Sequence, residues 1–195
     1  MKIEQIAVQT KIDTNSLIVM KEIEKKYLIK DGTKLVLTPS FLKLFPSIED
    51  LVREVAQKGQ IIRQGYLTLQ TAELLIQKLE LNPSFTPKEA RLRQKNNLFY
   101  FTLKGEGTIE REELEVTLSK ELFESYWLET ENRRIEKIRL EKPYEGHVAE
   151  FDVYINRLLI VAEIEFPSLE AAADIAPLGE DISIDKRYKN KNLAL

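Results

Sequence analysis

The chain has 195 residues, of which 43% are hydrophobic and 31% are charged, so we expect one folded domain with a substantial core and many ion pairs. The formal net charge of only −3 does not suggest general attraction to nucleic acid or to an anionic membrane. The lack of cysteine excludes disulfide bonds, zinc–thiolate sites and thiol nucleophiles, and the single histidine, His147, excludes a multi-histidine metal site.

Residues 1–20 lack a positively charged start followed by an apolar run, and no stretch approaches roughly 18 apolar residues. We therefore predict neither a signal peptide nor a transmembrane helix, and we expect a cytoplasmic protein. This leader carries no clear secondary-structure pattern.

The first third of the chain predicts a strand over 21–29, a turn at Asp31-Gly32 and a short extended piece over 35–37. A helix follows over 47–59, because Ser47 and Asp50 match a capping pattern in front of an apolar stripe.

The middle of the chain is richer in alternating segments. We predict a strand over 61–69, a helix over 71–79 capped by Thr71, and a loop marked by Pro83 and Pro87. Three strands follow, over 90–94, 98–104 and 110–118, with Gly105 and Gly107 in the last turn.

The last third predicts a helix, then three strands, then a short helix. Ser119 caps a helix over 119–130, and Pro177 closes the final helix. The tail, residues 182–195, has no clear periodicity. The three strands are predicted over 135–141, 148–156 and 159–166, and the final short helix over 168–176.

One face of nearly every predicted strand is charged. Residues i and i+2 of a strand point to the same side, so Glu22, Glu24 and Lys26 share a face opposite Ile23 and Tyr27. Like charges recur at this spacing in Glu22/Glu24, Arg91/Arg93, Glu113/Glu115, Lys137/Arg139 and Glu163/Glu165.

A solvated face would explain any one of these strands, since antiparallel sheets are commonly wet on one side. Repulsion repeated on several strands is better explained by ligands of opposite sign. Carboxylate pairs suit divalent cations, and Lys/Arg pairs suit phosphates. We therefore expect an α+β fold in which an antiparallel β-barrel has a charged interior and amphipathic helices cover its apolar exterior.

The ordered set of motifs resembles the CYTH superfamily, the triphosphate tunnel metalloenzymes, and most of all its small bacterial branch of inorganic tripolyphosphatases. The resemblance begins with Glu22-x-Glu24-x-Lys26 and covers about residues 20–195. The later motifs are Gln64-Gly65-Tyr66-Leu67, Arg91-x-Arg93, Thr102-x-Lys104, Arg111-x-Glu113-x-Glu115, Lys137-x-Arg139, Asp152, Glu163-x-Glu165 and Asp185-Lys186-Arg187-Tyr188-x-Asn190.

The resemblance implies an eight-stranded antiparallel tunnel that binds a triphosphate and needs Mg²⁺ or Mn²⁺, with two ions during turnover. Phosphate oxygens would be held by Lys26, Arg91, Arg93, Lys104, Lys137, Arg139 and Arg187. Metal ligands would be Glu22, Glu24, Asp152, Glu163 and Glu165, with Glu113, Glu115 and Lys186 as supporting charges.

The implied activity is metal-assisted transfer of the terminal phosphate of inorganic tripolyphosphate to water, without a covalent intermediate. Catalytic roles would fall to Glu24, Lys137, Tyr66 and Glu165. A packed aromatic in a Gly-Tyr turn is an equal explanation for Tyr66.

Other residues have plainer interpretations. Arg111, Glu141 and Glu150 lie near strand ends, and we expect them to be solvated. We expect Trp127 to pack between a helix and the barrel and His147 to be incidental. Glu113 and Glu115 pair equally well with tunnel cations as with a metal.

We expect residues 1–195 to form a single CYTH domain with an N-terminal extension over 1–20 and insertions near 31–60 and 71–88. These additions are candidates for capping the tunnel, restricting substrates or forming a homodimer. The expected partner is a small triphosphate, with no nucleic acid and no membrane.

Two alternatives to tripolyphosphate hydrolysis stay open from sequence alone. The same tunnel can act on an organic triphosphate, by ATP cyclisation, thiamine triphosphate hydrolysis or nucleoside triphosphate hydrolysis. A polyphosphate or nucleotide sensor without turnover is the other, and the clustered carboxylates argue against it.

Overall fold

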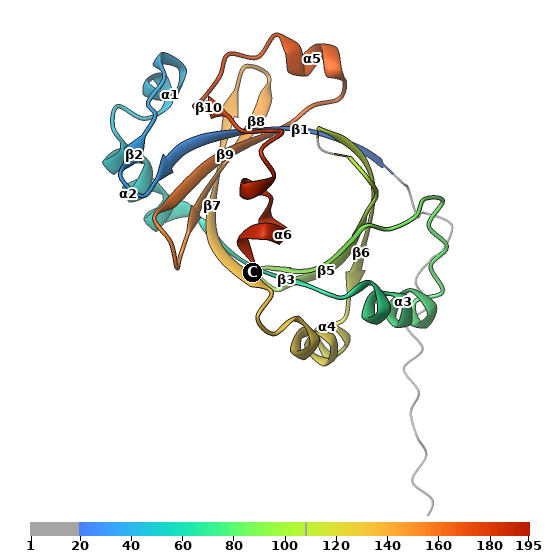
Figure 1. The fold of residues 1–195 in the computed structure, drawn as a ribbon. Coiled ribbons are helices and arrows are strands. Elements are labelled where there is room, and N and C mark those ends of the chain that lie inside the picture. Colours follow the sequence, from blue (N-terminus) through green and yellow to red (C-terminus); the bar gives the residue numbers. More distant parts are fainter. Residues whose placement is uncertain (1–19, 108) are drawn as a thin grey trace, which may run out of the picture.

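The computed structural model describes residues 20–107 and 109–195, so the predicted leader lies almost wholly outside the described residues. Eight antiparallel strands close into a barrel in the order β1-β6-β5-β4-β3-β7-β8-β9, and β9 pairs back onto β1 (Figure 1). The predicted α+β barrel is confirmed. The strands are β1 Met20–Asp31, β3 Gln60–Tyr66, β4 Glu89–Lys95, β5 Leu98–Lys104, β6 Glu110–Leu118, β7 Arg134–Tyr144, β8 His147–Tyr154 and β9 Leu159–Glu165.

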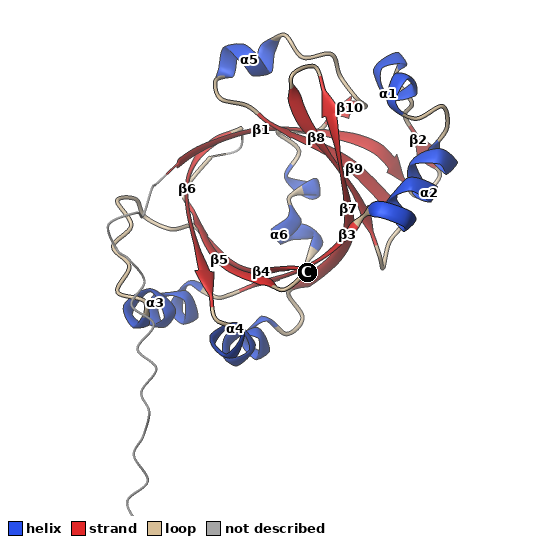
Figure 2. Ribbon diagram, turned by 180° about the vertical axis from the view of Figure 1, so that it is seen from behind, coloured by secondary structure: helices blue, strands red, loops and turns tan. Residues whose placement is uncertain are grey.

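Helices α1 to α5 lie outside this barrel, and the short elements of the C-terminal tail lie across its interior (Figure 2). None of the helices in the described part of the chain is long and apolar enough to span a membrane. The helices are α1 Pro39–Leu44, α2 Ile48–Lys58, α3 Leu69–Lys78, α4 Lys120–Trp127 and α5 Leu169–Ala173. The remaining elements are β2 Lys34–Leu35, the 3₁₀ helix η2 Leu128–Thr130, β10 Glu180–Asp181, the 3₁₀ helix η3 Lys186–Tyr188 and α6 Asn190–Leu193.

Capping residues set most helix starts as the sequence predicts. Ser47 Oγ accepts a hydrogen bond from the Asp50 backbone N–H at 3.2 Å, and Ser119 accepts from Leu122 at the same distance. The predicted cap at Thr71 is wrong, because Thr68 Oγ1 accepts from the Thr71 N–H at 3.0 Å and α3 begins earlier. The preceding strand accordingly ends at Tyr66 rather than at residue 69.

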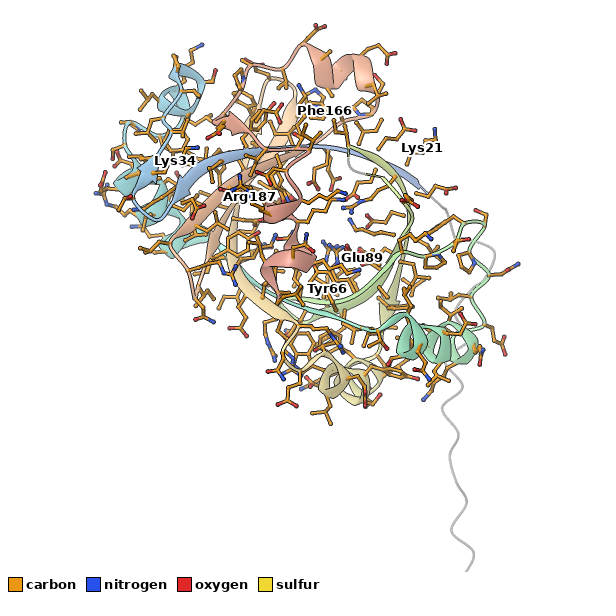
Figure 3. The ribbon with its side chains drawn as sticks, viewed as in Figure 1. Lys21, Lys34, Tyr66, Glu89, Phe166 and Arg187 are labelled. Atoms are coloured by element: carbon orange, nitrogen blue, oxygen red, sulfur yellow. The ribbon has the colours of Figure 1, made fainter. Side chains whose placement is uncertain are left out.

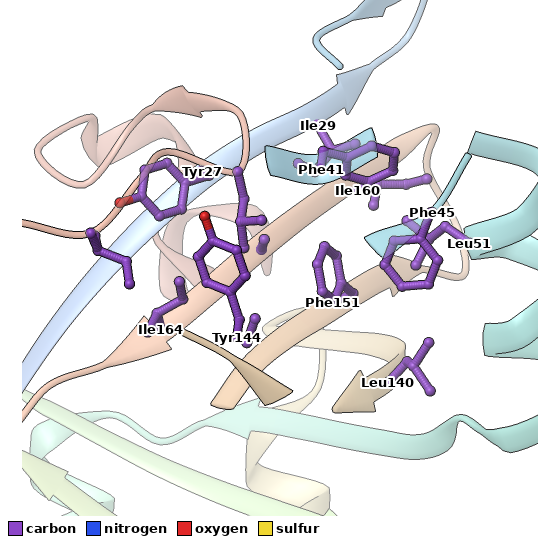
Figure 4. Packing of buried hydrophobic residues seen from close by; sticks show 14 of the residues in the cluster. Tyr27, Ile29, Phe41, Phe45, Leu51, Leu140, Tyr144, Phe151, Ile160 and Ile164 are labelled. Carbon is purple, nitrogen blue, oxygen red and sulfur yellow. The ribbon is translucent and has the colours of Figure 1, made fainter. Parts of the chain in front are cut away.

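The two larger hydrophobic clusters lie outside the barrel wall, between the strands and the covering helices. Around β1, β8 and β9, aromatic residues of α1 pack on the strands, and the Phe45 and Phe151 ring centroids are 5.0 Å apart, edge to face (Figure 4). A second cluster fills the space under α3 and α4, where Phe123 stacks on Trp127 at 5.2 Å. The prediction that Trp127 packs between a helix and the barrel is therefore confirmed.

The barrel interior is divided into two halves of opposite character. Along β1 the inward face changes from Glu22, Glu24 and Lys26 to Leu28, which is 1% exposed. The apolar residues at this end form a third cluster with the C-terminal tail, which we call the apolar plug. Its buried members are Leu28, Tyr66, Ile135, Tyr154, Leu159, Val161, Ile182 and Ala194, with Tyr188 and Leu193 packed against them.

Backbone and side-chain hydrogen bonds hold the tail in this position. β10 pairs with β1 at Tyr27 and Leu28, and the Ile182 N–H donates to the Lys26 carbonyl at 2.9 Å. In both ribbon views α6 lies within the ring of strands (Figures 1 and 2). The tail therefore fills one end of the barrel, although its sequence predicted no regular structure.

Candidate functional site

The charged half of the interior surrounds a cavity of about 210 Å³, which we call the chamber. Side chains from all eight barrel strands and from the tail reach it, and Tyr66 and Glu89 are labelled inside the ring of strands in Figure 3. The lining residues are Glu22, Glu24, Lys26, Gln64, Tyr66, Glu89, Arg91, Arg93, Lys104, Arg111, Glu113, Glu115, Lys137, Arg139, Glu150, Glu163, Glu165, Ile182, Ser183, Asp185, Lys189 and Asn190.

Most of the predicted cations meet in this chamber. Lys26, Arg91, Arg93, Lys104, Lys137 and Arg139 all line it. The tail residues behave differently: Arg187 is 81% exposed and pairs with Asp185 at 2.6 Å, and Lys186 is exposed. Neither belongs to the lining, so the structure does not bring the predicted phosphate contact Arg187 or the predicted supporting charge Lys186 together with the others.

The predicted carboxylates divide into lining and buried residues. Glu22, Glu24, Glu113, Glu115, Glu163 and Glu165 line the chamber, whereas Asp152 is fully buried behind it. The sequence interpretation of Arg111 and Glu150 as solvated residues is wrong, because both side chains line the chamber and form ion pairs. Glu141 is 47% exposed, as expected.

Sequence reasoning missed Glu89 and Lys189. Glu89 lies two residues before Arg91 on β4, so the alternation that identified Arg91 and Arg93 also contains it. Lys189 comes from the irregular tail, where no periodicity could assign it to the interior.

One ion-pair network joins β1 to β5 and β6. The two carboxylate oxygens of Glu22 each accept from Lys104 Nζ at 2.8 Å, and one accepts from Arg111 Nε at 2.6 Å. These cations outweigh the effect of burial and hold the pKa of Glu22 well below its usual range. Glu22 is therefore a permanent anion in this network.

A second network lies deeper, between β7, β8 and β9. Asp152 accepts from Arg139 Nε at 2.7 Å and from Lys137 Nζ, and Glu163 accepts from Arg139 at 2.6 Å. Lys26 Nζ lies 2.7 Å from the other oxygen of Glu163. Burial, followed by the charge of Arg139, lowers the pKa of Lys137.

A third network presents two guanidinium groups from β4. Arg93 donates to both oxygens of Glu115, at 2.9 and 2.8 Å, and Arg91 donates to Thr102 at 3.2 Å. The buried Nε–H groups of Arg91 and Arg93 have no hydrogen-bond partner among the described residues. Buried donors normally have a partner, so these two groups leave unused hydrogen-bonding capacity beside the chamber.

Three carboxylates in the chamber are close enough to share one cation. One oxygen from each of Glu22, Glu24 and Glu165 lies within 4.8 Å of the others. Burial and the nearby Glu163 raise the pKa of Glu24 to about 7, and displacement of water together with Glu150 and Glu22 raises the pKa of Glu165 to about 7. A hard oxygen-binding cation fits this donor set and would relieve its repulsion. Asp152 and Glu163 lie outside this group.

Tyr66 lies at the boundary between the chamber and the apolar plug. Its hydroxyl accepts a hydrogen bond from Gln64 Nε2 at 3.2 Å, and burial raises its pKa, so the phenol stays protonated. The glycine before it allows close packing, because a Cβ on Gly65 would come within 2.4 Å of Thr130 Oγ1. Tyr66 therefore packs in the apolar plug and also lines the chamber, and its catalytic role stays a prediction.

Two kinds of comparison relate the chain to known proteins. It is 40% identical over 140 residues to an inorganic triphosphatase of Nitrosomonas europaea, across 69% of this chain and 83% of that protein. The crystal structure of the inorganic triphosphatase NE1496 matches with 33% identity and a TM-score of 0.51, covering 89% of this chain and 97% of that one. A second structure, described as the hypothetical protein NE1496, matches with a TM-score of 0.50. No protein-family model matches the chain.

Proposed function

Because the chain belongs to the triphosphate tunnel metalloenzymes of the CYTH superfamily, we propose that it hydrolyses the terminal phosphate of inorganic tripolyphosphate in the chamber, with a divalent metal. The observation that carries this proposal is the chamber itself, where Arg and Lys side chains from several strands and a group of three carboxylates face one cavity of about 210 Å³. The similarity to an inorganic triphosphatase supports the same substrate.

The cations bind and align the phosphate chain. Arg91 and Arg93 line the chamber, their buried Nε–H groups have no partner among the described residues, and guanidinium groups suit phosphate oxygens. Lys26, Lys104, Lys137 and Arg139 would complete the binding surface. Their carboxylate partners keep these side chains extended and charged in a buried site, so little rearrangement is needed when the substrate enters.

The metal would be held by Glu22, Glu24 and Glu165, whose oxygen donors suit Mg²⁺ or Mn²⁺. When bound, such an ion neutralises phosphate charge and lowers the pKa of a coordinated water. Asp152 and Glu163 lie outside this group of three carboxylates, so we assign them to positioning. Asp152 pairs with Lys137 and Arg139, and Glu163 pairs with Lys26 and Arg139.

Proton transfer needs an acceptor for the attacking water and donors near the leaving phosphate. Glu24 and Glu165 each have a second carboxylate oxygen that the ion need not occupy, and that oxygen would accept the proton of the attacking water. The lowered pKa of Lys137 makes it a better acid toward the leaving phosphate. The protonated Tyr66 hydroxyl would donate a hydrogen bond to a phosphate oxygen or to the water.

The test measures phosphate release from tripolyphosphate, ATP and pyrophosphate side by side, with Mg²⁺, with Mn²⁺ and with a chelator. We expect metal-dependent release from tripolyphosphate and its loss in Glu24→Ala. Glu112→Ala is the matched control, because Glu112 is an exposed carboxylate on β6 outside the chamber lining.

Other outcomes would redirect the proposal. Faster turnover of ATP would move the function to organic triphosphates. Tight tripolyphosphate binding without turnover under either metal would identify a sensor and reject the enzymatic role.

A further inference from the structure

Lys189 is a chamber cation on the tail, between η3 and α6. Its side chain is part of the lining, together with Asp185 and Asn190 of the same segment. The ammonium donates to the Gly107 carbonyl at 3.0 Å, across the β5–β6 turn. Hydrogen bonding between the Tyr154 hydroxyl and Asn190 Oδ1 fixes the adjacent tail residue to the barrel wall.

Its electrostatic environment differs from that of the other chamber cations. Lys26, Arg91, Arg93, Lys104, Arg111, Lys137 and Arg139 each have a carboxylate within 4.0 Å. Within residues 20–107 and 109–195, Lys189 has no such partner and rests on a neutral carbonyl. Its charge is therefore not neutralised by a contacting carboxylate of the described chain.

The position of Lys189 relative to the apolar plug limits what it can bind. Ile182, Tyr188, Leu193 and Ala194 of the tail pack among inward-facing barrel residues on one side of it. Lys26 Nζ, in the chamber lining, donates to the carbonyl of Tyr188, which packs against the apolar plug, at 3.4 Å. The chamber and the plug are therefore in direct contact at this point. A ligand beside Lys189 thus meets a closed end of the barrel interior.

We propose that Lys189 is a substrate-binding residue that recognises the free end of an inorganic phosphate chain at the closed end of the chamber. The proposal rests on the proposed function and extends it to substrate selection. An unesterified terminal phosphate brings up to two negative charges to this ammonium, whereas a phosphate esterified to a nucleoside brings one and adds a bulky group. With Lys189 on the tail, the nucleoside of such a ligand would lie against the apolar plug.

The test compares Lys189→Met with Lys191→Met in the full chain. Lys191 is the matched control, because it lies on the same segment and also donates to a backbone carbonyl, that of Lys88 at 3.3 Å, but is exposed and outside the chamber. We expect Lys189→Met to raise KM for tripolyphosphate about tenfold, as for a lost hydrogen bond to a charged group, with kcat changed less than about threefold. Lys189→Arg should recover most of the affinity.

The same variants also test the selectivity for tripolyphosphate over ATP. The ratio of kcat/KM for tripolyphosphate to that for ATP should fall severalfold in Lys189→Met and stay constant in Lys191→Met. An equal loss for both substrates would overturn the assignment of Lys189 to the unesterified end. Equal KM values in the two methionine variants would overturn its role in binding.

Calorimetric binding of tripolyphosphate to the metal-free protein separates this inference from the proposed activity. If wild-type protein binds but does not hydrolyse tripolyphosphate, the proposed function fails while a selective, roughly tenfold weakening in Lys189→Met still supports the binding role. Unchanged binding in that variant, with a melting temperature equal to that of wild type, contradicts it.

Discussion

The two halves of the barrel interior are built from the same strands and differ in what they contribute. In the charged half, Glu24 is partly buried, and displacement of water together with the nearby Glu163 raises its pKa to about 7, so ionising it opposes folding. In the apolar half, Leu28 and Val161 are almost fully buried against the tail and contribute stability through burial of apolar area. Lys26 and Leu28 lie only two positions apart along β1.

The comparison indicates that residues serving the proposed activity and residues stabilising the fold lie in adjacent halves of the same barrel. The apolar plug packs directly beside the chamber, so its burial supports the strands that carry the charged side chains. Substitutions should therefore separate the two properties, with activity lost in one half and stability lost in the other.

The largest expected effect is on activity in the charged half. Glu24→Gln removes a metal-capable carboxylate and should reduce metal-dependent phosphate release by at least about 100-fold. The same variant should unfold at the same or a higher temperature without metal at neutral pH, because a partly buried carboxyl with a raised pKa is replaced by a neutral amide. Loss of both activity and stability would break the proposed separation.

The complementary test changes a residue of the apolar plug, where stability rather than activity should be lost. Leu28→Ala should lower the free energy of unfolding by about 2–4 kcal/mol, because it removes a fully buried side chain facing the tail. Denaturant unfolding measures the loss, and phosphate release per folded molecule should fall far less than in Glu24→Gln. Val52→Ala, at a side chain on α2 that is 45% exposed, is the control and should have a small effect on both.

The pH dependence of stability should also reflect the charged half. Glu24 and Glu165 have folded-state pKa values of about 7, above the ordinary value of 4.5, so the folded state binds their protons more tightly than the unfolded state does. Their contribution is fully present below about pH 4.5 and is lost as the pH rises through about 7, and solvent screening makes the part from the exposed Glu165 the smaller one. Melting temperatures of the metal-free protein across this window measure it.

Two further conditions sharpen the pH experiment. Adding Mg²⁺ or Mn²⁺ should restore stability most at pH 7 and above, where both carboxylates are ionised. Glu24→Gln should flatten the metal-free profile. A profile that is equally steep in this variant would show that other groups control it.

The smallest expected effect concerns the contact between the two halves. Tyr154→Phe removes the hydrogen bond to Asn190 and should cost about 1 kcal/mol of stability. Because Asn190 is next to Lys189, KM for tripolyphosphate should rise about two- to threefold through poorer positioning of the tail. Tyr126→Phe, a tyrosine on α4 outside the chamber lining, should leave KM unchanged.

The strand pattern and the charged chamber could be predicted from sequence because both depend on local alternation. Glu22, Glu24 and Lys26 identify the inward face of β1 without any knowledge of the partner strands. Arg111 was misassigned because its position near a turn outweighed its place in that alternation.

The apolar plug and α1 were missed for different physical reasons. Leu28 continues the inward alternation of β1, but an apolar residue on a charged face gives no indication of what covers it. The tail is ordered by contacts with strands more than 100 residues earlier, such as Ile182 with Lys26, rather than by its own periodicity. The six residues of α1, capped by Thr38, are too few to show a helical repeat.

The closure of the barrel has a consequence for how the chain folds. β1 pairs with β9, so Glu24 faces Glu165 across some 140 residues of intervening sequence. Contacts this distant in sequence slow folding, because a long loop must close before they form. During synthesis β1 leaves the ribosome before β9 and the tail. Until they are made, β1 lacks these partners, and its apolar outer face is exposed to other nascent chains and to chaperones.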